Sequence, residues 1–144
     1  MNVEAILKSK GSEIVTIAPT APIVDAVRLL SEKRIGALVV ITKGDAPQGI
    51  LSERDIVHAL AERGAKLFDL TVGDLMTRRV VTCAPGDSIA ELMAQMTAHR
   101  IRHLPVLANG RLVGIVSIGD VVKNRLEEIE GESASLRDYI AGAA

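Results

Sequence analysis

The heptapeptide GILSERD (residues 49–55) returns later in the chain as GIVSIGD (residues 114–120), with glycine, serine and aspartate at matching positions. In both copies the glycine and two aliphatic residues have the composition of a short strand, and the serine precedes a segment that reads as a helix. A strand-to-helix junction that occurs twice in one chain indicates an internal repeat.

The repeat extends well beyond the two heptapeptides. Residues 14–23 (IVTIAPTAPI) align with residues 80–89 (VVTCAPGDSI), and Arg34-Ile35 aligns with Arg100-Ile101. A repeat of this length is longer than the unit of a solenoid, which predicts two copies of a small α/β motif. The segments ahead of the two copies also agree in pattern: Val3, Ile6 and Leu7 correspond to Val72, Leu75 and Met76.

Each copy predicts the same order of elements: strand, helix, strand, strand, helix. Helices are predicted where apolar residues recur at i, i+3, i+4 and i+7, and strands where short aliphatic runs end at turn residues. Asn109-Gly110 is a two-residue hairpin signal, whereas the first copy has the longer turn TKGDAP (residues 42–47). The predicted strands are residues 15–17, 37–41 and 48–51, then 81–83, 104–107 and 112–116, and the predicted helices begin near residues 23, 52, 89 and 117.

One such β-α-β-β-α half has a three-stranded sheet and two helices, too few elements to bury both faces of the sheet. We therefore expect a mixed α/β (α+β) fold in which the two halves pack through their sheets. The chain of 144 residues, 48% of them hydrophobic, is large enough to form that shared core.

Composition excludes several classes of partner. The net charge is −1 and the aromatic residues are one Phe and one Tyr, so neither a basic surface nor a stacking platform for nucleic acid is expected. The N-terminal segment lacks the apolar region of a signal peptide, and no aliphatic run is long enough to span a bilayer, so we expect no membrane association. The single Cys83 cannot form an internal disulfide, which is consistent with a cytoplasmic location.

The sequence also offers little chemistry for catalysis. His58, His99 and His103 have no metal-ligand spacing with one another or with Cys83, so we expect no metal site. Cys83 lies among apolar residues, where a buried inert thiol is the expected state. No pair of nucleophile and base can be assembled, and we therefore expect no enzyme and no catalytic cofactor.

The repeated motifs together resemble a tandem pair of CBS domains, also called a Bateman module. The resemblance rests on DLMTRRVVTCAP (residues 74–85), RIRHLPV (residues 100–106) and the two heptapeptides, and it extends from Val3 to about Leu126. It implies one repeat in residues 1–70, including an N-terminal lead-in helix, a second in residues 71–125, and an extension in residues 126–144. It further implies pseudo-twofold packing, with two clefts that bind adenosine-containing ligands such as AMP, ATP, NAD(H) or S-adenosylmethionine.

The Ser-x-x-Asp pattern within each heptapeptide has two interpretations. A serine followed by an acid three residues later is a capping box, which needs no ligand. The same geometry places free amide groups and a hydroxyl where phosphate can bind, beside a carboxylate able to accept both ribose hydroxyls. Because the pattern recurs in both copies of a chain that resembles a nucleotide-binding family, we favour ligand contact for Asp55 and Asp120.

The resemblance assigns the remaining ligand contacts to two unequal clefts. One would combine Asp120 and Ser117 with Thr16, Ile35, Gly36 and Ala37, and the other Asp55, Ser52 and Arg54 with Thr82, Ile101 and Arg102. Thr16 and Thr82 are also good strand formers, so their assignment rests on the resemblance alone.

Arg102 and His103 occur where the first copy has Gly36 and Ala37. Either side chain fits a phosphate in one of the clefts, or a pyrophosphate that spans the middle. The alternatives are a solvated charge for Arg102 and a partly packed imidazole for His103. Binding is the interpretation we favour, with AMP as the first choice of ligand and NAD(H) or ATP next.

The tail carries apolar residues at alternating spacings of three and four. Leu126, Ile129, Leu136 and Ile140 follow this spacing, with Ser133 between them and an interruption at Gly131. A solvated extension is one interpretation, but an apolar stripe outside the core predicts a helix that helps to hold a homodimer.

The sequence thus favours a regulatory ligand sensor that acts on an unknown downstream protein. The alternative is a dimerisation and partner-docking scaffold that binds no ligand and in which Ser-x-x-Asp is only a cap.

Overall fold

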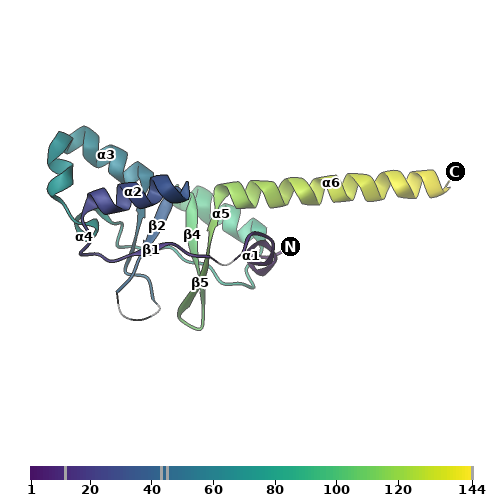
Figure 1. Cartoon of the computed structure of the whole chain (residues 1–144). Helices are drawn as coiled ribbons and strands as arrows, with labels where there is room; N and C mark the ends of the chain where they lie inside the picture. The colour runs from purple at the N-terminus through teal and green to yellow at the C-terminus, as the bar shows by residue number, and fades with distance from the viewer. Residues whose placement is uncertain (12, 43, 45, 144) are drawn as a thin grey trace.

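The computed structural model describes residues 1–11, 13–42, 44 and 46–143, and it contains two α/β halves from which a long C-terminal helix projects (Figure 1). This mixed α/β architecture of two repeats confirms the predicted fold class. The elements are α1 (Val3–Lys10), β1 (Thr16–Ile17), α2 (Ile23–Lys33), β2 (Ala37–Val40), β3 (Gly49–Ser52), α3 (Glu53–Arg63), the 3₁₀ helix η1 (Gly64–Asp69), α4 (Val72–Leu75), α5 (Ile89–His99), β4 (His103–Ala108), β5 (Arg111–Ser117) and α6 (Ile118–Ala143).

The first half contains a three-stranded sheet in the order β1-β2-β3. β1 runs parallel to β2, and β2 pairs with β3 in antiparallel register, with Leu38 opposite Leu51. All four residues of the central strand β2 are buried, as expected for an aliphatic run covered on both faces. Lys43 and Asp45 of the predicted turn between β2 and β3 lie outside the described residues.

The second half repeats the hairpin but not the first strand. Asn109 and Gly110 join β4 to β5 with φ values of 53° and 77°, the positive values that a type I′ turn requires, so the hairpin prediction is confirmed. The predicted strand at residues 81–83 is wrong in extent, because only Cys83 forms a bridge, in parallel with Val106.

Pro105 explains the missing strand. In the first half Val39 N donates to Val15 O at 3.4 Å, and Ile41 N donates to Ile17 O at 3.1 Å, so β1 pairs over two residues. In the second half Leu107 N donates to Cys83 O at 2.9 Å, but Pro105 occupies the position of Val39 and has no amide hydrogen to donate. The ladder therefore stops after one bridge.

The lead-in helix of each half packs on the other half. Val3 and Ile6 of α1 belong to the core that contains α5, β4 and β5, whereas Val72 of α4 belongs to the core that contains α2, β2 and β3. Val3 N donates to Asp87 O at 3.0 Å, and Val72 N donates to Ala21 O at 2.9 Å. Figure 1 shows α1 beside α5 and α4 beside α2. The two halves are thus joined by exchanged segments.

The glycine of each heptapeptide makes room for the exchanged segment. A Cβ atom at Gly49 would lie 2.6 Å from Met76 Sδ, and one at Gly114 would lie 2.5 Å from Leu7 Cδ2. Leu7 and Met76 are the corresponding residues of the two lead-in segments, so the contact follows the internal repeat. Any larger residue at either glycine must displace the Leu7 or Met76 side chain of the segment that joins the halves.

The C-terminal helix joins the helix predicted to begin near residue 117 with the extension predicted for residues 126–144. α6 runs without a break from Ile118 to Ala143, so Gly131, which interrupts the apolar spacing of the sequence, does not interrupt the helix. A glycine inside a helix lowers the stability of the helix by only about 1 kcal/mol relative to alanine. The hydrogen bonds of the surrounding turns outweigh this loss.

We expect Gly114→Ala to lower the free energy of unfolding by about 1 to 3 kcal/mol, the range for overpacking a close contact. Thermal and urea denaturation measure the effect, and Gly86→Ala is the control because a Cβ there meets no atom within 4 Å. In a Leu7→Ala background, where the contact is relieved, Gly114→Ala should cost less. An equal cost in both backgrounds would contradict the packing explanation.

Candidate functional site

The two Ser-x-x-Asp patterns lie at the starts of α3 and α6, and both form complete capping boxes. Ser52 N donates to Asp55 Oδ2 at 2.9 Å, and Asp55 N donates to Ser52 Oγ at 3.2 Å. The same two bonds, at the same two distances, join Ser117 and Asp120. Each box uses only the Oδ2 atom of its carboxylate, so capping leaves Oδ1 available for another donor.

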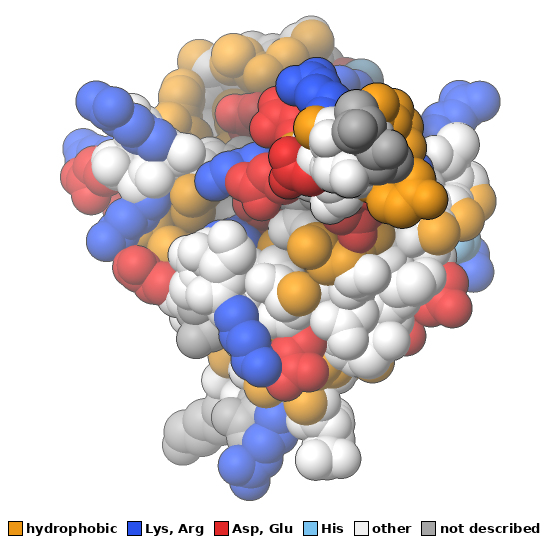
Figure 2. Space-filling view, turned by 90° about the vertical axis from the view of Figure 1, so that its right-hand side faces the viewer, with side chains coloured by type: hydrophobic (Ala, Val, Ile, Leu, Met, Phe, Trp, Pro, Cys, Tyr) orange, Lys and Arg blue, Asp and Glu red, His pale blue; other side chains and the backbone are white. Residues whose placement is uncertain are grey.

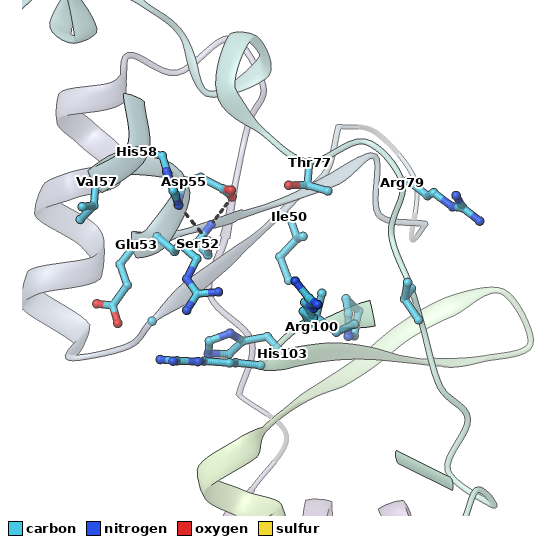
Figure 3. A pocket seen from close by; sticks show the side chains of 16 residues that line it. Ile50, Ser52, Glu53, Asp55, Val57, His58, Thr77, Arg79, Arg100 and His103 are labelled. Carbon is cyan, nitrogen blue, oxygen red and sulfur yellow. Dashed lines mark hydrogen bonds between the residues drawn. The ribbon is translucent and has the colours of Figure 1, made fainter. Parts of the chain in front are cut away.

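The first cleft is a cavity of about 510 Å³ between the two halves, and Asp55 lines it. Ile50, Ser52 and Arg54 line it from the first half, and residues 100–103 line it from the second half. Figure 3 shows Ser52 and Asp55 on one side of the cleft and His103 and Arg100 across from them. The cleft is thus formed only when both halves are in place.

The first cleft is rich in cationic side chains. Arg54, Arg79, Arg100 and Arg102 line it, against the two carboxylates of Glu53 and Asp55. Within the described ranges, none of these four guanidinium groups takes part in an ion pair. Uncompensated guanidinium groups beside a helix N-terminus favour an anionic ligand.

The second cleft, of about 450 Å³, is the pseudo-symmetric counterpart, and Asp120 and Ser117 line it together with residues 33–37. The carboxylate of Asp120 already has a cationic partner. Lys10 of α1 donates to Asp120 Oδ2 at 2.6 Å and to Ile115 O at 2.9 Å. The exchanged lead-in segment therefore brings a lysine into the second cleft.

The Lys10 ammonium lowers the pKa of Asp120. Burial by itself raises the pKa of Asp120, but the hydrogen bonds from Lys10 Nζ and Ser117 N outweigh burial and hold the pKa below the ordinary carboxyl value. Asp120 is therefore ionised at neutral pH and held by the lysine.

His103 lines both clefts from the start of β4. Its imidazole packs on Gly36, where a Cβ atom would lie 3.1 Å from His103 Cε1. Burial lowers the pKa of His103, and the nearby Glu53 carboxylate opposes that effect only in part. His103 is thus a neutral group at neutral pH, able to donate one hydrogen bond and accept another.

The structure brings most of the predicted site residues together. Ser52, Arg54, Asp55, Ile101 and Arg102 line the first cleft, Ile35, Ala37, Ser117 and Asp120 line the second, and Gly36 and His103 line both.

Thr16 and Thr82 line neither cleft, so the structure does not support their predicted placement. Their neighbours Val15 and Val81 line the second and first clefts instead. Adjacent residues of an extended chain point to opposite sides, so the threonine side chains turn away from the clefts when the valines face them.

Sequence reasoning missed several cleft residues, among them Lys10, His58, Arg79 and Arg100. A signal existed for three of these four. Arg100 aligns with Arg34 of the second cleft, both as left-handed helix caps with φ of 53°. Lys10 and Arg79 are matched by the alignment of the two lead-in segments. His58 carries no comparable signal.

Other chemistry is sparse in the part of the chain that the structure describes. No cluster of three or more His, Cys, Asp or Glu residues there is arranged to hold a metal ion. Burial raises the pKa of the Cys83 thiol to about 12, which keeps it protonated and unreactive at neutral pH. No described helix combines the length and the hydrophobicity that a membrane span requires.

Comparisons with known proteins agree on one family. The CBS domain model matches residues 4–62 and again residues 72–127. The chain is 34% identical over 145 residues to the mitochondrial CBS domain-containing protein CBSX3 of Arabidopsis thaliana, which covers 95% of this chain and 70% of that protein.

Two solved structures are also similar to the chain. A CBS-domain containing protein from Agrobacterium tumefaciens has a TM-score of 0.84 and 43% identity, covering 87% of this chain and 99% of that one. The CBS domain pair of protein MJ0100, in complex with 5′-methylthioadenosine and S-adenosyl-L-methionine, has a TM-score of 0.76 and 26% identity, covering 85% and 98% of the two chains.

We expect Lys10→Met to lower the free energy of unfolding by about 0.5 to 1 kcal/mol at neutral pH, the upper part of the range for partly exposed ion pairs. Because the pairing lowers the folded-state pKa of Asp120, this contribution is present above the unfolded pKa and is lost as the pH falls through the folded pKa. The difference between parent and variant should therefore disappear in strong acid, as measured by urea denaturation across a pH series.

Lys8→Met is the matched control for this measurement. Lys8 lies on the same helix and pairs with Glu4 at 3.8 Å, but both side chains are largely exposed. A Lys8 effect as large as the Lys10 effect, or a Lys10 effect that does not vary with pH, would contradict the assignment.

Proposed function

The chain belongs to the CBS-domain family, and from that premise we propose that it is a regulatory module that binds an adenosine nucleotide and acts as a ligand sensor. The observation that carries this proposal is the first cleft, in which a capped aspartate faces unpaired arginines across the boundary between the halves. MJ0100, a protein of similar fold, is known in complex with two adenosine-containing compounds. We place the ligand of this chain in the same chemical class.

The shape and walls of the first cleft suit a nucleoside. Its volume of about 510 Å³ lies within the usual range of about 300 to 1,000 Å³ for small-molecule sites. Ile50, Val57, Val81 and Ile101 supply apolar wall for a base. The free Oδ1 atom of Asp55 can accept hydrogen bonds from ribose hydroxyls without breaking the helix cap.

The charge of the first cleft favours a ligand that carries phosphate. Four guanidinium groups and two carboxylates line the cleft, and arginine binds phosphate oxygens in a bidentate manner. We therefore propose AMP as the first choice, with NAD(H) and ATP next. S-adenosylmethionine ranks lower here because its sulfonium centre is cationic and would face these arginines.

The two clefts are proposed to bind unequally. Asp55 has no cationic partner among the described residues, whereas Asp120 is held by Lys10. A ribose entering the second cleft meets a carboxylate whose charge Lys10 already compensates and whose Oδ2 atom already accepts from Lys10 and Ser117. The first cleft is thus the principal site, and His103, which lines both clefts, is the group through which the two can sense each other.

The scaffold alternative is favoured by one observation: both Ser-x-x-Asp boxes are complete as helix caps without any ligand. In that case the chain would serve to dimerise and to dock a partner. We propose no catalytic activity and no catalytic cofactor under either interpretation.

The proposed sensor acts as a homodimer in the cytoplasm and transmits its state to an unknown downstream protein. The separate domains proposed are one repeat in residues 1–70, a second in residues 71–125 and the extension in residues 126–144. Although α1 belongs to residues 1–70, its apolar face packs in the core of the second unit.

We expect AMP to raise the melting temperature of the parent chain, since a ligand present at about 100 times its Kd stabilises by about 2.7 kcal/mol. Thermal shift measurements with AMP, ADP, ATP, NAD(H) and S-adenosylmethionine identify the ligand. Asp55→Ala should weaken binding at least about tenfold, because a hydrogen bond to a charged group contributes about 1.5 to 3 kcal/mol.

Asp74→Ala is the control for the loss of a helix cap. Asp74 forms the equivalent box with Thr71 at the start of α4, and it lines neither cleft. It should reduce stability without changing ligand affinity. If no adenosine compound shifts the melting of the parent, the sensor proposal is overturned and the scaffold remains.

We expect Arg102→Ala to weaken the binding of AMP more than that of adenosine, because only AMP presents a phosphate to the guanidinium group. Isothermal titration of both compounds measures the difference, and Arg28→Ala, on an exposed part of α2 outside both clefts, is the control. Equal losses for AMP and adenosine would show that Arg102 shapes the cleft instead of binding phosphate.

A further inference from the structure

The C-terminal part of α6 leaves the body of the protein and carries exposed apolar side chains along one face. Val122, Leu126, Ile129, Leu136 and Ile140 are all 44% exposed or more. Figure 2, which looks at the side toward which α6 projects, shows hydrophobic side chains to one side of the helix tip and charged ones to the other. A contiguous apolar face of this kind indicates a partner.

The five exposed apolar residues, together with the half-buried Ser133, follow a heptad spacing. Spacings of 4, 3, 4, 3 and 4 connect residues 122, 126, 129, 133, 136 and 140, which places Leu126, Ser133 and Ile140 at a positions and Val122, Ile129 and Leu136 at d positions. Gly131 falls at an outer f position, away from this seam. The seam is about 28 Å long at 1.5 Å per residue.

The body of the protein covers the opposite face of the same helix. Val121 and Asn124 are buried, and Glu128 pairs with the N-terminal ammonium group at 3.6 Å. These three residues occupy c and f positions. The seam at a and d therefore points away from the body and is accessible to another chain.

The charges beside the seam indicate which partner and which orientation fit. In a parallel, in-register pair of identical helices, each g residue faces the e residue five positions later on the partner. Arg125 then faces Glu130, and Glu132 faces Arg137. Both contacts join opposite charges. Because the pair has twofold symmetry, each contact forms twice, once on either side of the seam.

An antiparallel pair of the same helices would place like charges together. With the a and d layers matched, e residues face e residues and g residues face g residues. Glu130 then faces Glu130, Glu132 faces Glu132, and Lys123 faces Arg137. Like-charge contacts of this kind select against that orientation.

We propose that two copies of this chain associate through a parallel, in-register, two-stranded coiled coil formed by residues 122–140. This assigns a surface and an orientation to the homodimer included in the proposed function, and it does not depend on nucleotide binding. Both modules lie at the same end of the coil, with α6 of each leading directly from its second cleft.

The first experiment is light scattering of the full chain at micromolar concentration. The parent should have twice the mass of one chain, whereas Ile129→Glu/Leu136→Glu should have the mass of one, because it places charges in the apolar seam. Ser135→Glu, at an outer c position of the same helix, is the matched control and should remain dimeric. A monomeric parent, or a double variant that remains dimeric, would overturn the proposal.

The second experiment tests the orientation by disulfide formation. Leu126→Cys and Leu136→Cys should each form a covalent dimer alone under mild oxidation, because a parallel register places each residue opposite its own copy, whereas the antiparallel register described above places residue 126 opposite residue 136. An antiparallel register would instead require the two variants to be mixed. The parent is the control, since its only cysteine, Cys83, is buried. Cross-linking only in the mixture would overturn the parallel arrangement.

The third experiment exchanges the charges. Glu132→Arg should weaken the dimer at low salt by placing like charges across the seam, and Glu132→Arg/Arg137→Glu should restore it. Failure of the double variant to restore the mass would contradict the pairing. Nucleotide binding is measured on the same samples: a monomeric chain that binds AMP refutes the coiled coil alone, and a coiled-coil dimer that binds none refutes the sensor alone.

Discussion

Neither sheet of this protein can be covered by the helices of its own half, and the exchange of α1 and α4 is the constraint on which the rest of the structure depends. Val3 and Ile6 complete the core of the second half, and Val72 completes the core of the first. The exchanged segments can approach only because the heptapeptides begin with glycine, against which Leu7 and Met76 pack. Both clefts lie between the halves, so their geometry is fixed by the same contacts that satisfy the two cores. Stability and the candidate site are therefore products of one packing arrangement.

Two near-identical halves nevertheless produce unequal clefts, and the inequality can be traced to a few side chains. Gly36 leaves room for the His103 ring, whereas the corresponding position in the second half is Arg102, which adds a charge to the first cleft. The lead-in segments differ as well. Lys10 reaches Asp120, but its counterpart Arg79 points away from Asp55 at the edge of the first cleft (Figure 3). The Asp120 carboxylate is thus paired with Lys10, whereas the Asp55 carboxylate has no cationic partner among the described residues.

The internal repeat made most of the fold predictable from sequence, because a pattern that occurs twice supports each element by comparison with its copy. The hairpin at Asn109-Gly110 and both Ser-x-x-Asp helix starts lie where local turn and cap chemistry places them. The features that the sequence did not predict correctly depended on long-range packing. The strand at residues 81–83 was lost to the missing donor of Pro105, and the exchange that brings Lys10 to Asp120 joins residues more than a hundred positions apart. Thr16 and Thr82 line neither cleft for a different reason: the family resemblance gave a position, and the alternation of the extended chain decides which side chain faces the cleft.

The position of α6 connects the candidate site to the proposed dimer through a single element. Its first turn is capped by Ser117 and lines the second cleft, and its buried face, through Val121 and Asn124, rests on the second core. The same helix then continues without a break into the apolar seam. Lys10 ties this helix start to α1, and α1 packs in the core of the second half, so the cap and the lysine belong to one packed unit from which the seam extends. A ligand that contacts Asp120 would act at the start of the helix that is proposed to join two copies, whereas a ligand in the first cleft shares His103 and Gly36 with the second. The route from the second cleft to the proposed dimer therefore consists of one ion pair, one helix cap and one continuous helix, and a ligand in the first cleft is connected to it through His103.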